Sequence, residues 1–246
     1  MYSVSRKNCE NSAPLLPMRM FRLRTLTGSN VAGLLTGAAV YSQFFLLTLY
    51  MQQVLGFSAM KTGVCYITLT LSVIVFANVS QAVAHRVGTR PVLPFGLTLI
   101  TIGLVLYARL PVDGHYFWDM FPAFLLTGIG MAFTFIPMTI GALAGVREHD
   151  AGIASGLINT SQQIGGAVGV AVATTIAATF TGHWLDDHPL ATPANATGLV
   201  HGYSIAFYAL AALAASAAVL AAVIVESRTK AAEEPEPGEL ALEQAA

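Results

Sequence analysis

The sequence predicts an all-α membrane protein in which six apolar helices cross a lipid bilayer as one bundle. Of the 246 residues, 55% are apolar and only 10% are charged, whereas a soluble domain carries about 25% charged residues to cover its surface. The apolar residues also fall into six runs, each near or above the ~20 residues that span a hydrocarbon core of ~30 Å. Runs such as 31–40 and 205–225 lack the polar face that a soluble helical bundle would need.

The six predicted spans cover about 28–51, 62–83, 92–109, 118–144, 153–180 and 202–225. The third run is short and the fourth and fifth are long. We therefore divide the chain into a basic N-terminal segment at 1–27, a six-helix transmembrane bundle at 28–225 and an acidic tail at 226–246. The tail gathers glutamate and proline, a composition typical of disordered segments.

Basic residues set the expected orientation, because loops on the cytoplasmic side of a membrane are enriched in lysine and arginine. With the N-terminus inside, only Lys61 and Arg109 of the 12 basic residues lie outside. The other ten fall on the cytoplasmic side: Arg6, Lys7, Arg19, Arg22, Arg24, Arg86, Arg90, Arg147, Arg228 and Lys230. We therefore expect a multi-pass protein of the cell inner (plasma) membrane with both termini in the cytoplasm.

The fifth predicted helix carries amide side chains in a membrane span. At 100° per residue, its polar and small residues share one side: Ser155, Asn159, Gln162, Gln163, Gly166, Gly169 and Ala173. Leu157, Ile164, Val168 and Val172 fall opposite. Placing an amide side chain at this depth costs free energy unless it is hydrogen-bonded to another group or to water. Either Asn159, Gln162 and Gln163 line a substrate path, or they join helices by hydrogen bonds.

Glycines on the same helix favour close helix packing. Gly152 and Gly156 have the spacing of a GxxxG contact, as do Gly165 and Gly169, and Gly166 lies between the latter two. This pattern predicts that the glycines are packing residues rather than ligand contacts.

Other spans contribute fewer candidates. Gln43 of the first span and Asn78 of the second are predicted to face the same substrate cavity. Pro137 removes a backbone hydrogen bond within the fourth span and predicts a kink or hinge. In the short loop at 84–91, a tight turn at Gly88 would hold Arg86 and Arg90 at the membrane surface.

Ionisable residues are placed only near the span boundaries. No Asp, Glu, Lys, Arg or His falls well inside a predicted span, although an ion-coupled carrier usually keeps such a residue at depth. The sequence therefore predicts a polar pathway without an energy-coupling site. It predicts no catalytic residues, no metal site and no cofactor, and it lacks the basic face of a nucleic-acid-binding protein.

Four segments together resemble the fourteen-span multidrug-efflux carriers of the major facilitator superfamily. They are PLLPMRMFRLRTLTGSN, YMQQVLGFSAMKTG, the RVGTRP loop and DAGIASGLINTSQQIGGAVGVAV, within a match from about Pro14 to Lys230. The loop departs from the family's pattern at His85 and Thr89, and Gln162 stands where members often carry arginine. The resemblance covers only the C-terminal half of such a carrier and implies that the proton-coupling carboxylates belong to the N-terminal half.

The resemblance implies transmembrane transport rather than enzymatic activity. We expect the C-terminal half of a drug:proton antiporter, acting in drug resistance, whose partners are the lipid bilayer and small amphipathic or drug-like substrates. The chain is then a truncated reading frame, not competent alone, whose partner is a missing N-terminal half. The alternative is a half-carrier that pairs with a second copy or another chain, or a membrane subunit that does not transport.

Overall fold

The computed structural model describes residues 24–143, 146, 150–188 and 196–224, which form six long helices. The helices are α1 (Arg24–Leu49), α2 (Ala59–Val87), α3 (Thr89–Tyr107), α4 (Phe121–Leu143), α5 (Ala151–Asp186) and α6 (Ala196–Ile224). A π-helical turn, η3 (Tyr50–Val54), extends α1, and another, η4 (Tyr116–Met120), precedes α4. All six are long and apolar enough to cross a membrane, so the predicted six-helix membrane fold is confirmed. Residues 1–23 of the predicted N-terminal segment at 1–27, and the whole predicted tail at 226–246, lie outside the described residues.

Five of the six helices extend past at least one of their predicted ends, whereas α4 lies within its predicted span at 118–144. The fifth, expected at 153–180, covers Ala151–Asp186, and the loop expected at 84–91 shrinks to Gly88 alone. Hydropathy detects only the part of a helix that lies in hydrocarbon, whereas a helix continues wherever its backbone hydrogen bonds remain satisfied. Gly88 adopts a φ of 89°, a conformation that a residue with a Cβ rarely accepts. This residue ends α2 and begins α3 within a single turn.

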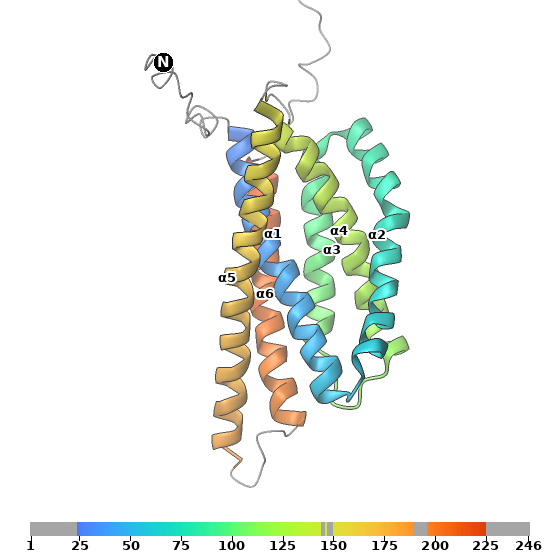
Figure 1. The fold of residues 1–246 in the computed structure, drawn as a ribbon, viewed down its shortest axis with the longest axis vertical. Coiled ribbons are helices and arrows are strands. Elements are labelled where there is room, and N and C mark those ends of the chain that lie inside the picture. The colour runs from blue at the N-terminus through green and yellow to red at the C-terminus, as the bar shows by residue number, and fades with distance from the viewer. Residues whose placement is uncertain (1–23, 144–145, 147–149, 189–195, 225–246) are drawn as a thin grey trace, which may run out of the picture.

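The helices pack in two groups of three (Figure 1). α1, α5 and α6 contact one another on one side, α4 packs on α2 and α3 on the other, and α3 against α6 joins the groups. In the span formed by α1 and η3, 61% of the most apolar stretch of 18 residues is buried inside the bundle, whereas the corresponding stretches of α2 and α5 are 22% and 28% buried. The open face of α2 accordingly carries more exposed large apolar side chains than any other helix.

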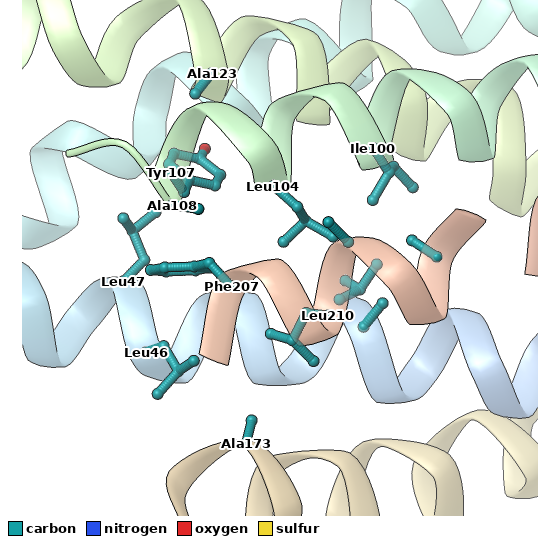
Figure 2. Close-up of a cluster of buried hydrophobic side chains, with 14 of the residues drawn as sticks. Leu46, Leu47, Ile100, Leu104, Tyr107, Ala108, Ala123, Ala173, Phe207 and Leu210 are labelled. Carbon is teal, nitrogen blue, oxygen red and sulfur yellow. The ribbon is translucent and has the colours of Figure 1, made fainter. Parts of the chain in front are cut away.

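Most of the largest fully buried side chains gather where α1, α3, α4 and α6 meet. Phe207 of α6 lies beside Leu47 of α1 and Tyr107 of α3 (Figure 2), with 5.7 Å between the Phe207 and Tyr107 ring centroids. Phe124 of α4 packs edge-on against Tyr107 from the other side, at 5.8 Å. All four side chains are at most 1% exposed. This aromatic cluster joins the two helix groups into one unit.

The two ends of the bundle differ in charge. At one end α1 begins, α6 ends and Gly88 joins α2 to α3; we name it the Gly88 end. At the other end lie η3, η4 and the start of α6; we name it the Tyr116 end. Among the described residues, Arg86 and Arg90 lie at the Gly88 end. At the Tyr116 end, Lys61 and Arg109 are accompanied by four aspartates: Asp113, Asp119, Asp186 and Asp187.

Tyrosine hydroxyls tie the segments together at the Tyr116 end. Tyr50 of η3 donates a 2.6 Å hydrogen bond to the carbonyl oxygen of Pro111, after α3. Tyr116 of η4 donates at 2.9 Å to the carbonyl of Cys65 in α2. These bonds join η3 to the segment after α3, and η4 to α2.

Candidate functional site

A polar groove lies between α4 and α5 towards the Gly88 end. It encloses about 160 Å³ and is lined by Phe135, Thr139, Leu143, Ser155, Ile158, Asn159 and Gln162. Ser155, Asn159 and Gln162 reach it together because positions three, four and seven residues apart share one side of a helix. Asn159 is exposed, and Gln162 is half-buried. The groove thus offers amide and hydroxyl groups, which can hydrogen-bond an uncharged polar ligand.

The other residues of the predicted polar face separate into two environments. Gln163 is exposed and lies next to the groove residue Gln162 along the helix. Gly166, Gly169 and Ala173 are buried against α1 instead. The predicted lipid-compatible residues Ile164, Val168 and Val172 are 53–58% exposed. The amides therefore border the crossing of α5 over α1, and the glycines lie inside it.

The glycines at 165, 166 and 169 lie where α5 approaches α1 most closely. A Cβ built on Gly165 would overlap the backbone of Leu34, and one on Gly169 would overlap Ala38. A Cβ on Gly166 would meet the ring of Tyr41. Around Gly152 and Gly156, in contrast, a Cβ would meet no atom within 4 Å. A packing role for each of these glycines stays a prediction, and the crossing supports it for the C-terminal three.

Gln43 and Asn78 lie in different environments. Gln43 is 1% exposed within the bundle, and its Nε2 has no hydrogen-bond partner among the described residues. Asn78 is exposed on α2. Neither lines the groove that holds Asn159 and Gln162. The structure gives no basis for the expectation that Gln43 and Asn78 face the same space, because α1 turns Gln43 towards the core.

The predicted hinge and loop residues occupy helices. Pro137 is buried within α4, where it leaves the carbonyl of Phe133 without its usual helical donor. A Cβ on Gly96 of α3 would overlap that same carbonyl group. Arg86 lies in the last turn of α2, and Arg90 is the second residue of α3. Their predicted roles in hinge motion and membrane binding stay predictions.

A second cavity, of about 560 Å³, opens at the Tyr116 end between α1, η3, α5 and α6. Most of its lining is apolar, including Phe45, Leu49 and Leu185, and its polar members are Gln53, Thr174, Thr181 and Tyr203. Sequence reasoning did not assign these residues to a site. Gln53 and Tyr203 are 150 residues apart, and a single sequence gives no signal that brings them together.

Comparisons with known proteins agree on one group of membrane carriers. The sequence profile of the Major Facilitator Superfamily matches residues 3–170. The puromycin resistance protein pur8 of Streptomyces alboniger is 34% identical over 90% of this chain and 44% of its own length. The cephamycin export protein CmcT of Amycolatopsis lactamdurans is 32% identical over 87% of this chain and 42% of its own length.

A lincomycin resistance protein of Streptomyces lincolnensis is 34% identical over 65% of this chain and 33% of its own length. The chain therefore spans less than half the length of the relatives that it matches. Their names concern resistance to, or export of, small organic compounds.

Proposed function

Because the chain belongs to the major facilitator superfamily, we propose that it is the C-terminal six-helix half of a proton-coupled multidrug efflux transporter. The observation that carries the proposal is the match to resistance and export proteins over up to 90% of the chain, together with the polar groove on α5. In this proposal the groove at Asn159 and Gln162 forms part of the wall along which substrate moves. Movement comes from rocking of this bundle against an N-terminal bundle, since superfamily halves are related by an axis along the membrane normal.

We place proton coupling in the N-terminal bundle. Within the described helices, each ionisable Asp, Glu, Lys, Arg or His lies within about two turns of a helix end. A coupling group usually lies at depth, where its protonation responds to conformation. This placement supports a division of labour in which the present half contributes neutral polar contacts and its partner contributes the carboxylates.

We further propose that the protein lies in the plasma membrane and that its Gly88 end faces the cytoplasm. Arg86 and Arg90 lie at that end, and the positive-inside rule then places both termini in the cytoplasm. The bilayer and an amphipathic, drug-like substrate are the proposed partners, in addition to the N-terminal bundle. We propose no catalytic role.

Export measured in a drug-sensitive host tests the function. The chain alone is compared with the product that is made when the genomic DNA preceding it is included, with ethidium efflux followed before and after a protonophore. We expect protonophore-sensitive efflux only from the longer product. In that product, Asn159→Ala should slow efflux, while Thr179→Ala, on an exposed part of α5 away from the groove, should not.

Three results would count against the proposal. Proton-driven efflux by the chain alone would place the coupling site here. A longer product that does not export, but that co-purifies with an intact carrier, would favour the alternative of a subunit that does not transport. Unchanged efflux by the Asn159→Ala variant at normal expression would show that Asn159 does not contact the substrate and has only a packing role.

A further inference from the structure

The cavity at the Tyr116 end owes its existence to the path of α5. Near the middle of the bundle α5 lies against α1, where Gly165 meets the backbone of Leu34. Towards the Tyr116 end it lies against α6 instead, where Gly202 meets Ala177 and Thr181. As α5 leaves α1, a wedge opens between them, and this wedge is the 560 Å³ cavity. A volume of ~300–1,000 Å³ is typical of sites for small molecules.

We propose that this cavity binds an uncharged amphipathic small molecule that carries a carbonyl or ether oxygen. The apolar body would pack on Phe45 and Leu49, which line the wedge with other aliphatic side chains. The oxygen would accept a hydrogen bond from the Gln53 amide. A mostly apolar cavity with a few fixed polar groups is the usual form of a small-molecule site.

Tyr203 fixes the chemistry of the Gln53 side chain. The Tyr203 hydroxyl is 2.8 Å from Gln53 Oε1 and donates to it. Tyr203 itself is only 5% exposed, so the bond holds the amide at the edge of the cavity. The bond occupies one of the two lone pairs of the amide oxygen, whereas both N–H groups of Gln53 lack a partner among the described residues and are the larger part of what the side chain offers to a ligand. A ligand acceptor therefore fits better than a ligand donor.

The lining also argues against an ionised ligand. Its polar members are an amide, two threonine hydroxyls and a phenol, and none carries a charge at neutral pH. Burying an ion without an opposite charge is strongly unfavourable. The cavity therefore selects neutral molecules.

This cavity is separate from the groove at the Gly88 end. Asn159 borders the groove and Ala178 borders the cavity, and 19 residues of α5 correspond to about 28 Å at 1.5 Å per residue. All the lining comes from α1, η3, α5 and α6. Binding is therefore a property of this chain alone and does not depend on the proposed transport function.

Photolabelling with benzophenone, an uncharged diaryl ketone, tests the proposal. The purified chain in detergent micelles is irradiated with benzophenone, and the adducts are located by peptide mass spectrometry. We expect saturable adducts within 45–53 and 174–185, the two segments that border the wedge. Labelling that does not saturate, or that spreads evenly over exposed apolar faces such as that of α2, would overturn the proposal.

Two matched pairs of variants sharpen the test. Ala178→Trp fills the cavity and should reduce the saturable labelling at least fivefold, whereas Thr179→Trp, at an exposed neighbour outside the lining, should leave it unchanged. Gln53→Leu should weaken benzophenone binding about threefold to tenfold through loss of one hydrogen bond, and Gln52→Leu should not. Equal effects within both pairs, at unchanged helical circular dichroism, would refute the assigned site.

A lipid ester and a soluble ketone share the chemistry that the cavity selects. Addition of phosphatidylcholine to the micelles distinguishes them. Competition by the lipid would identify a bilayer lipid as the natural source of the ligand, and labelling that persists would identify a soluble compound. Both results are consistent with a cavity that binds a ligand through its acceptor oxygen.

Discussion

Gly37 of α1 lies directly against the backbone carbonyl of Gln162 on α5, so closely that a Cβ at position 37 would overlap it. Three residues further along α5, Gly165 makes the reciprocal contact with the backbone of Leu34. In a bilayer, helix association gains little from the hydrophobic effect and depends on close van der Waals contact. The reciprocal glycines therefore set the distance between α1 and α5, and with it the position of the Gln162 amide in the groove.

The first prediction concerns glycines on a single helix. Gly165→Ala should destabilise the folded chain by about 1–3 kcal/mol, because the added methyl group has no space and the backbones must separate. Gly156→Ala should be neutral or stabilising by up to ~1 kcal/mol, because nothing lies within 4 Å and alanine favours the helix. Unfolding in mixed micelles with increasing dodecyl sulfate measures both. Equal loss of stability in the two variants would show that the crossing does not depend on its glycines.

The sequence allowed prediction of the glycines on α5 but not of their partners. Periodicity placed Gly165 and Gly169 on one side of a helix, and that information is local. Gly33 and Gly37 of α1 have the same four-residue spacing, yet their role depends on which helix lies opposite, and this is a tertiary property. The six membrane spans could also be predicted from local sequence, because a long apolar run distinguishes a helix in lipid from a helix in water.

The rotation of α1 was the least predictable feature. Gln43 looked like a pathway residue because amides in a membrane usually face water or a partner. The structure instead turns it to the core at 1% exposure. α1 is covered on several sides by α4, α5 and α6, so its polar residues do not mark an open face. On α5, which is only 28% buried, the polar residues do border an open groove.

The second prediction concerns the aromatic cluster that joins the helix groups. Phe207→Ala should destabilise the chain by about 1–3 kcal/mol. This is less than the ~3–5 kcal/mol usual in soluble cores, since lipid is as apolar as the core and only packing is lost. Tyr208→Ala, on an exposed neighbour at 45% exposure, should change stability little. The same dodecyl sulfate titration compares them, and a larger loss for Tyr208→Ala would contradict the packing seen in Figure 2.

The third prediction concerns the tyrosine at the Tyr116 end that ties η3 to the segment after α3. Tyr50→Phe removes the hydroxyl that donates to the Pro111 carbonyl at 2.6 Å. A net loss of about 0.5–1.5 kcal/mol is expected, with faster hydrogen exchange confined to residues 108–115. Tyr41→Phe alters an exposed side chain on the same helix and should leave exchange in this segment unchanged. Unaltered exchange in Tyr50→Phe would mean that the segment is held by other contacts.

The fourth prediction uses the reactivity of introduced cysteines to distinguish residues in the groove, in the core and on the lipid-facing surface. A thiol reacts with a charged methanethiosulfonate reagent only where water reaches it, because the thiolate is the reactive form. In a Cys9→Ser background, Asn159→Cys should react rapidly, and Gln43→Cys and Val168→Cys slowly. Gln43 is buried and Val168 is 58% exposed on a face that the bilayer would cover. Equal reactivity at 159 and 168 would show that the groove is not an aqueous pathway.

The fifth prediction tests the proposed orientation. Asp113 is exposed at the Tyr116 end, and Val87 is 63% exposed at the Gly88 end. If the basic Gly88 end faces the cytoplasm, a membrane-impermeant maleimide should label Asp113→Cys in intact cells. It should label Val87→Cys only after the membrane is permeabilised, again in a Cys9→Ser background. Labelling at 87 but not 113 in intact cells would invert the topology. Arg86 and Arg90 would then lie outside the cell, where the positive-inside rule does not place them.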